Sequence, residues 1–238
     1  MAGVDTAVIV GAALFIAALA VGIVFAVRAA IARAARIRAE YLAIAARQGW
    51  EFIATDAYDR PGRYSGFTPF GKGDKRRAEN VLSGPYQGTT VDLFTYRYEV
   101  TTSNGKTTQT TVYRNRIVAM QMPVAAPNLT LSKETLGKKI FDALGGEDID
   151  FEWDEFSRRF WVKCDDRKFA YDAIDARMME WLMAQADAGV DWQWRGRTLM
   201  VTKVGRFSPE ECLPALAFAQ GFRERLPRVL LEKHKAMA

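Results

Sequence analysis

An uninterrupted apolar run near the N-terminus constrains this chain more than any other feature. Residues 7–27 read AVIVGAALFIAALAVGIVFAV and contain no charged side chain. A helix of this length rises about 30 Å, the thickness of the hydrocarbon core of a bilayer. A buried core helix would be shorter or carry a polar face, and a cleaved signal peptide would begin with basic residues. Because only Asp5 and the terminal amine carry charge before the run, we predict that residues 1–27 are an extracytoplasmic tip and a retained transmembrane helix.

The charges on either side of this run predict its orientation. No Lys or Arg precedes it, whereas four arginines follow closely, namely Arg28, Arg33, Arg36 and Arg38. Excess positive charge beside a span stays in the cytoplasm, so we expect the N-terminus outside and the rest of the chain in the cytoplasm. Cys164 and Cys212, expected to be unpaired, agree with a reducing compartment. The small residues Gly11, Ala18 and Gly22 leave open a protein partner or self-association in the membrane.

Residues 28–49 continue as a predicted juxtamembrane helix, because they are rich in Ala and Arg and contain no proline. Ile37, Tyr41, Ile44 and Ala45 fall on one helical face, and Gly49 is a good stop signal. We expect this stripe to dock on the domain that follows. The alternative is a basic amphipathic helix that lies on the membrane surface.

The remainder of the chain predicts an α+β fold of antiparallel hairpins with packed helices. Residues 50–122 are mostly β, with a hairpin at Asn104-Gly105, and the strand pattern is expected to stop at Pro123. Residues 123–127 (PVAAP) are the best internal boundary, so residues 128–227 are expected to form a second subdomain with the order β-β-α-β-β-α, followed by a tail at 228–238.

Within the second subdomain, Leu136 to Leu144 predicts a short helix, and strands are expected over 149–153 and 160–164. Asp165 or Asp166 is expected to cap one helix that reaches about Ala186. Arg195-Gly196 predicts a hairpin turn. The run Ser208-Pro209-Glu210-Glu211 predicts a capped helix start.

A glycine-rich basic stretch at 66–77 is the most suggestive candidate for binding. Lys72, Lys75, Arg76 and Arg77 could contact an anionic lipid headgroup or a phosphate-bearing ligand, since glycines let backbone N–H groups approach an anion. The spacing fits neither a Walker A loop nor a dinucleotide fingerprint. Residues 1–120 carry 15 Lys and Arg against 9 Asp and Glu, whereas residues 121–238 carry 18 against 19. The excess positive charge therefore lies in the membrane-proximal half; the alternative is a solvated basic loop.

Four carboxylates alternate with apolar residues in the stretch Asp148, Asp150, Glu152 and Asp154. On a strand they would share one face, either as a hard-cation or acid–base site or as the solvent-facing side of a half-buried strand. We favour the structural interpretation, because the spacing does not fit an EF-hand loop and Arg158 and Arg159 could neutralise these acids. The sequence predicts no metal site and no cofactor.

The single histidine, His234, argues against most familiar hydrolase and zinc chemistry. No recognition helix, zinc finger or RNP strand accompanies the basic pI of about 9.2, so we expect no nucleic-acid partner. The favoured function is a membrane-anchored adaptor, accessory subunit or ligand-sensing module without catalytic activity. The alternative is an enzyme that acts on a lipid or phosphorylated substrate through carboxylates such as Asp150 and Glu152 together with basic residues.

Four short runs resemble those of one known protein family. They are RAENVLSG at 77–84, FTYRY at 94–98, DIDFE at 148–152 and EFSRRF at 155–160. They are similar to an uncharacterised family of bacterial, chiefly actinobacterial, single-pass membrane proteins with a soluble α+β domain. The likeness covers most of residues 45–227, and the Phe-Ser-Arg-Arg-Phe stretch is its most specific part. The resemblance implies a bacterial source, hence the inner (cytoplasmic) membrane, and supplies no catalytic residues.

Overall fold

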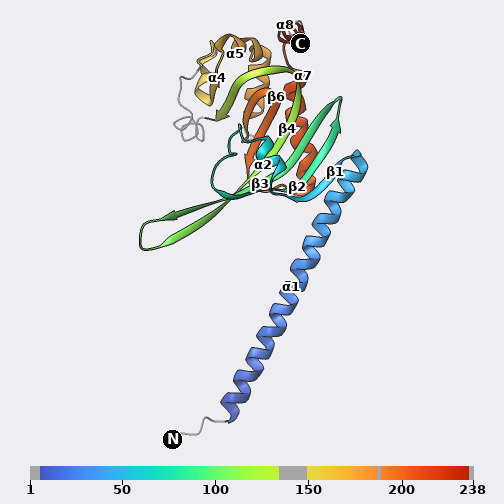
Figure 1. Cartoon of the computed structure of the whole chain (residues 1–238), viewed down its shortest axis with the longest axis vertical. Helices are drawn as coiled ribbons and strands as arrows, with labels where there is room; N and C mark the ends of the chain where they lie inside the picture. Colours follow the sequence, from blue (N-terminus) through green and yellow to red (C-terminus); the bar gives the residue numbers. More distant parts are fainter. Residues whose placement is uncertain (1–5, 134–148, 187–188, 236–238) are drawn as a thin grey trace.

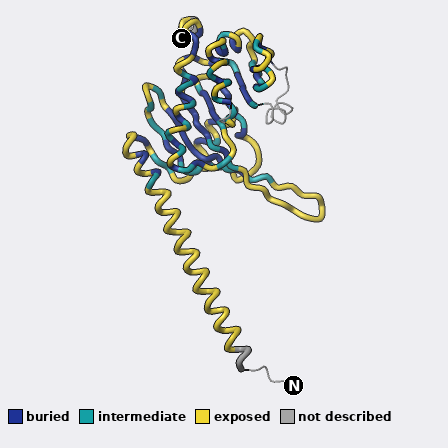
Figure 2. Tube along the Cα trace, turned by 180° about the vertical axis from the view of Figure 1, so that it is seen from behind, coloured by how far each residue is buried: buried dark blue, intermediate teal, exposed yellow. Residues whose placement is uncertain are grey.

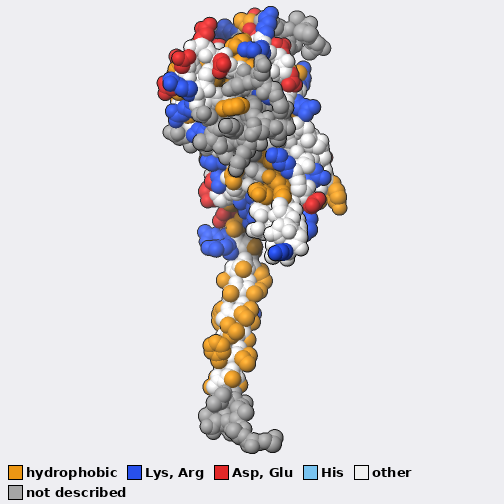
Figure 3. Space-filling model, turned by 90° about the vertical axis from the view of Figure 1, so that its left-hand side faces the viewer, with side chains coloured by type: hydrophobic (Ala, Val, Ile, Leu, Met, Phe, Trp, Pro, Cys, Tyr) orange, Lys and Arg blue, Asp and Glu red, His pale blue; other side chains and the backbone are white. Residues whose placement is uncertain are grey.

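The structure, a computed structural model, describes residues 6–133, 149–186 and 189–235. It begins with α1 (Thr6–Gln48), one continuous helix that projects from the folded part of the molecule (Figure 1). Its apolar portion has a mean hydropathy of 2.7 and makes no buried contact, so it is long and apolar enough to cross a membrane. Hydrophobic side chains cover this portion in Figure 3.

The C-terminal end of α1 is locked into the fold, as predicted. Tyr41, Ile44 and Ala45 are buried, whereas Ile37, one turn earlier, is exposed. The Tyr41 hydroxyl donates to the carbonyl of Phe207 over 2.9 Å. Gly49 ends the helix with φ of +67°, a conformation that favours glycine. Figure 2 shows the change from an exposed to a buried helix at this end. The juxtamembrane stripe therefore packs against the domain rather than against a lipid surface.

Six strands form one antiparallel sheet behind this helix. They are β1 (Glu51–Asp56), β2 (Asp74–Tyr86), β3 (Thr89–Ser103), β4 (Thr108–Lys133), β5 (Phe160–Cys164) and β6 (Asp191–Val204). The strands β1 to β5 pair in chain order, and β6 pairs with the other edge of β4. The predicted α+β class, with a membrane helix followed by antiparallel strands and helices, is confirmed.

The hairpin at Asn104-Gly105 is also confirmed. β3 and β4 stay paired out to Ser103 and Thr108, and the Asn104 side chain accepts from the backbone N–H groups of Lys106 and Thr107. This hairpin extends well beyond the body of the sheet (Figure 1).

The strand end predicted at Pro123 and the hairpin turn predicted at Arg195-Gly196 were both wrong. β4 does not stop at Pro123, and β6 does not turn back at Gly196; the two strands run alongside each other through both positions. Their register shifts between Gln121 and Leu129, where Ala126 lies opposite Gly196. A proline and a positive-φ glycine are tolerated in a strand at such an irregularity, because the ladder there does not need the missing N–H. The predicted subdomains 50–122 and 128–227 thus share one sheet, and their division into independently folding units stays a prediction.

Seven helical segments complete the described fold. They are α2 (Asp59–Arg63), α4 (Asp154–Arg159), α5 (Arg167–Ala173), α6 (Ala176–Ala184), the 3-10 turn η2 (Pro209–Glu211), α7 (Cys212–Glu224) and α8 (Arg228–Lys235). Asp166 caps α5 as predicted, but the single helix expected to reach Ala186 is divided, because Asp175 caps a second start. Ser208 and Glu211 form the predicted capping box. The helix predicted at Leu136 to Leu144 lies outside the described residues.

Different elements pack on the two faces of the sheet. On the face that we call the helix face, Trp192 and Trp194 pack against Phe222 of α7 and join a core that extends to the end of α1. On the opposite face, the strap face, residues 57–73 cross the strands as a strap that contains α2. The strap places Tyr64 and Phe70 on Phe94.

Candidate functional site

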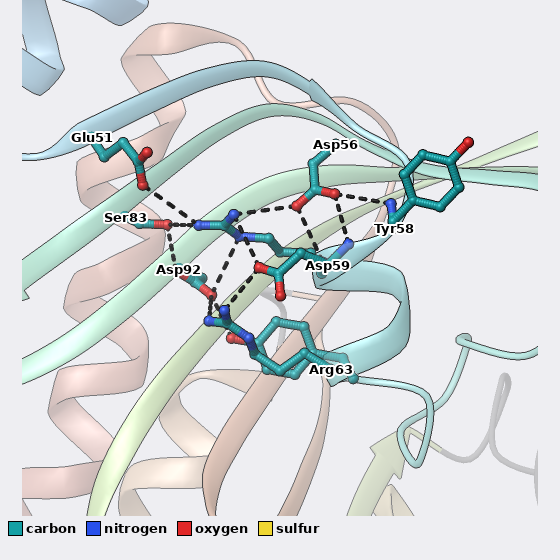
Figure 4. A network of polar contacts seen from close by, with 9 residues as sticks. Glu51, Asp56, Tyr58, Asp59, Arg63, Ser83 and Asp92 are labelled. Atoms are coloured by element: carbon teal, nitrogen blue, oxygen red, sulfur yellow. Dashed lines mark hydrogen bonds and ion pairs between the residues drawn. The ribbon is translucent and has the colours of Figure 1, made fainter.

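The strap is anchored to the strap face by a buried arginine. Arg60 of α2 is 7% exposed. Its guanidinium lies 3.2 Å from both Asp56 and Asp59 and 3.9 Å from both Glu51 and Asp92 (Figure 4). It also donates to the hydroxyl of Ser83 over 3.0 Å. Four carboxylates from two strands and one helix therefore surround a single cation.

Asp92 on β3 is the most buried acid of this cluster, with a side chain 7% exposed. It accepts hydrogen bonds from the hydroxyls of Ser83 and Tyr64, the latter over 2.6 Å, and Arg63 lies 3.5 Å away. Burial, reinforced by the neighbouring Asp92 carboxylate, raises the pKa of Tyr64 well above its usual range. The charged groups of this cluster pair with one another, so we interpret the cluster as a clamp that holds the strap on the sheet.

Sequence reasoning missed this clamp, although part of it has a local signature. Asp56 accepts from the N–H groups of Tyr58, Asp59 and Arg60, the pattern of an acidic residue before a helix start. Burial opposes this effect, but the three hydrogen bonds and the Arg60 guanidinium hold the pKa of Asp56 below its ordinary value.

The basic stretch does not form one anion-binding loop. Lys72 lies in the strap, whereas Lys75, Arg76 and Arg77 lie at the start of β2. Lys75 pairs with Glu99 over 2.9 Å, and Arg77 pairs with Glu79 over 2.9 Å. In the described part of the chain, Lys72 and Arg76 have no carboxylate partner. Contact of these four residues with lipid headgroups stays a prediction, and Lys72 and Arg76 are its best-placed members.

The arginines that follow the apolar run lie in the exposed part of α1. Arg28, Arg33, Arg36 and Arg38 are exposed, and Arg36 pairs only with Glu40, one turn later. This places a band of positive charge between the apolar run and the docked end of the helix, as the positive-inside interpretation requires.

The acidic strand face was a wrong prediction. Residues 149–153 form no strand, and Asp154 begins α4 instead of continuing an alternating pattern. Ile149 donates one backbone hydrogen bond to Val162 of β5, but the backbone N–H and carbonyl of Phe151 bond to the Ser157 hydroxyl instead of continuing a ladder. Asp150, Glu152 and Asp154 are exposed, and Asp148 lies outside the described residues. Among the residues that the structure describes, no three His, Cys, Asp or Glu side chains are placed to hold a metal ion.

Two hollows lie on opposite faces of the sheet. An apolar cleft of about 320 Å³ opens between β4, β6 and α7, lined by Val201, Phe207 and Phe218 and closed at one end by the Arg116–Glu211 ion pair. A polar cavity of about 150 Å³ lies on the strap face beside Lys72 and Asp191. Burial raises the pKa of Asp191, although hydrogen bonds from Ser132 and from the N–H of Lys133 oppose the shift. Each hollow is lined by one carboxylate, not by a pair.

Comparison with known proteins gives one informative likeness. No protein-family model and no curated protein matches the chain. The crystal structure of the mycobacterial trehalose monomycolate transport factor A, TtfA, resembles it with a TM-score of 0.52. The match covers 81% of this chain and 94% of that one at 14% sequence identity. At this identity the two proteins share a fold, and the likeness assigns no residue a role.

Proposed function

We propose that this protein is a membrane-anchored, non-catalytic accessory subunit of a membrane transport assembly, in the inner membrane of an actinobacterium. The observation that carries the proposal is the structure of α1. Its apolar portion is fully exposed, whereas the residues of its C-terminal end are buried in the core of the folded part. A helix fixed to the domain in this way holds the folded part beside whatever the apolar portion contacts in the bilayer. The arginine band favours a cytoplasmic folded part.

The structural neighbour supports the transport setting. TtfA is named as a mycobacterial transport factor, in keeping with the actinobacterial family that the sequence resembles. A non-catalytic role is favoured because the enzyme alternative calls for paired inward-facing carboxylates. Asp150 and Glu152, the residues on which that alternative relied, are exposed and lie outside both hollows.

The projecting hairpin is the surface that we assign to a partner protein. From Thr101 to Thr111 every residue is exposed. The ladder of β2 on β3 ends at Glu99, and that of β6 on β4 ends at Asn115, so both outer edges of the hairpin are unpaired within the described structure. An unpaired strand edge can accept a strand from another chain.

The root of the hairpin adds an apolar contact to these edges. Tyr113 is 44% exposed and stacks on Tyr98, and Val204 of β6 is 72% exposed. Asn115, two residues beyond Tyr113, pairs with Val204, so these side chains share the strap face. Exposed aromatic and aliphatic groups next to free strand edges favour a protein partner over solvent.

Affinity capture of the full-length chain from membranes in a mild detergent tests the proposal. One variant shortens the hairpin by joining Thr101 to Thr110 through an Asn-Gly turn, which removes only exposed residues. We expect the wild type to retain membrane proteins that the shortened variant loses, with the same unfolding temperature for both. A substitution away from the hairpin, Val229→Ser on α8, where the side chain is 55% exposed, is the control and should retain the partner. Recovery of the wild type as a lone chain would contradict the proposal.

The orientation is tested separately by fusing reporters to the C-terminus. We expect activity from a reporter that requires the cytoplasm and none from one that requires the periplasm. The opposite result would invalidate the cytoplasmic assignment without touching the hairpin proposal.

A further inference from the structure

The strap face changes from apolar to polar along the same two strands. Ile117 of β4 and Met200 of β6 are fully buried beneath the strap and belong to its core. Farther along this face β4 places Asn115, Thr130 and Ser132, all less than 9% exposed. Burying polar side chains costs free energy unless they are hydrogen-bonded, and apolar residues would fill the same positions more cheaply. Ser132 is hydrogen-bonded to Asp191 and Asn115 to Tyr98, so of these three it is Thr130, whose hydroxyl has no side-chain partner in the described chain, that is open to a ligand.

These residues line the polar cavity of about 150 Å³ at the root of the hairpin. The strap contributes Thr68 and Lys72, and β6 contributes Asp191 and Thr202. The strap is held in place over this region by Gln193, which accepts from the Thr68 N–H over 2.9 Å. Pro69, Tyr98, Trp192 and Val204 supply the apolar part of the lining, which is larger than the polar part. The cavity is thus built from the strap and the strands β3, β4 and β6, and the hydrogen bond of Gln193 fixes the strap over it.

Several of these groups have unused hydrogen-bonding capacity. In the described part of the chain, the hydroxyls of Thr68, Thr130 and Thr202 make no side-chain hydrogen bond, and the Lys72 ammonium has no carboxylate partner. Each hydroxyl can both donate and accept, and the ammonium can only donate. Asp191, which accepts from Ser132, adds an acceptor. The wall therefore presents donors and acceptors together.

The charges in the wall select among polar ligands. The Asp191 carboxylate would repel a multivalent anion such as phosphate, and the Lys72 ammonium would repel a cation. A neutral molecule with many hydroxyl groups satisfies both, because its oxygens accept from the ammonium while its O–H groups donate to the carboxylate and the threonines. We propose that this cavity binds a small, neutral, polyhydroxylated ligand of the carbohydrate class. The inference is independent of the accessory-subunit proposal, since it requires neither the hairpin nor a partner.

Saturation-transfer NMR on the full-length protein in phosphatidylcholine nanodiscs tests the site. The probes are glucose, galactose, mannose and myo-inositol, with inorganic phosphate as the anionic competitor. Extraction must avoid glucoside and maltoside detergents, because their headgroups belong to the proposed ligand class. We expect transfer to at least one polyol and none to phosphate. Binding of phosphate alone, or of no probe at millimolar concentrations, would overturn the assignment.

Matched variants locate the binding. Thr130→Val and Thr202→Val remove one hydroxyl each at nearly constant volume, and each is expected to weaken binding about three- to tenfold, the value of one neutral hydrogen bond. Thr102→Val makes the same change on the exposed hairpin and should bind as the wild type does. Lys72→Met, at an exposed position, tests the site without risk to the fold. Unchanged affinity in Thr130→Val, Thr202→Val and Lys72→Met would refute this location.

Discussion

Replacing Arg60 by Leu should destabilise the fold far more than the same change one turn later at Arg63. The side chains of Arg60, Asp56 and Asp92 are 9%, 10% and 7% exposed, so Arg60→Leu removes the cation that lies 3.2 Å from one buried carboxylate and 3.9 Å from another. Breaking a buried pair from one side costs about 3–5 kcal/mol. Because Arg63, Ser83 and Tyr64 still contact Asp92, we expect a cost near the lower end, about 3 kcal/mol. For a chain of this size that lowers the unfolding temperature by about 6–12 °C.

The assay is thermal unfolding of the full-length chain in detergent, followed by the fluorescence of its six tryptophans, all of which lie after residue 49. Arg63→Leu is the control: it removes another cation from Asp92, 3.5 Å away, but its side chain is 52% exposed, so its ion pairs are expected to contribute under about 1 kcal/mol. The double variant Arg60→Leu with Asp92→Asn removes one of the two buried carboxylates that faced Arg60 and should recover part of the loss. If Arg60→Leu matches Arg63→Leu, or if the double variant is less stable than Arg60→Leu alone, the clamp interpretation is wrong.

Three further expectations use the same assay. Because the pKa of Asp56 is depressed in the folded protein, this residue stabilises the fold above its unfolded pKa of about 4, and that stabilisation is lost as the pH falls below it. The unfolding temperature of Asp56→Asn should therefore fall less steeply than that of the wild type when the pH is lowered. The raised pKa of Asp191 has the opposite sign, so Asp191→Asn should raise the unfolding temperature at pH 7, a gain that disappears below about pH 4. A Cβ added at Gly84 would lie 2.1 Å from the Trp50 ring, so Gly84→Ala should cost about 1–3 kcal/mol and loosen the junction with α1; a change below that range would contradict it.

The features predicted correctly from the sequence are those with strong local causes. The apolar run of α1 needs only length and composition, and its docking stripe needs only helical period. Asn104-Gly105 dictates a hairpin because those two residues accept the required backbone without help from distant contacts. The caps at Asp166 and Ser208 rest on hydrogen bonds within three residues.

The features that were mispredicted depend on distant pairing. A proline such as Pro123 or a glycine such as Gly196 can occur either in a turn or at an irregularity within a strand. Only the pairing of β4 with β6 shows that the second alternative applies here. The Arg60 clamp and the polar cavity have no local signal as units, because each gathers side chains from the strap and from well-separated strands. Lys72 was selected for its charge, and the structure places it beside hydroxyl groups rather than in a cationic loop.

The helix between membrane and domain limits how a partner can be reached. Residues 28–48 contain no glycine or proline, and thirteen residues separate Arg28 from Tyr41, the most buried residue of the docked stripe. At 1.5 Å per residue this holds the docked turn about 20 Å beyond the end of the apolar run, farther than the headgroup layer extends. Because α1 is one unbroken helix, the domain cannot swing freely toward the bilayer. If the apolar run spans the bilayer as proposed, a partner in the same membrane would need a folded surface at this height, and the projecting hairpin is the element that we propose contacts it.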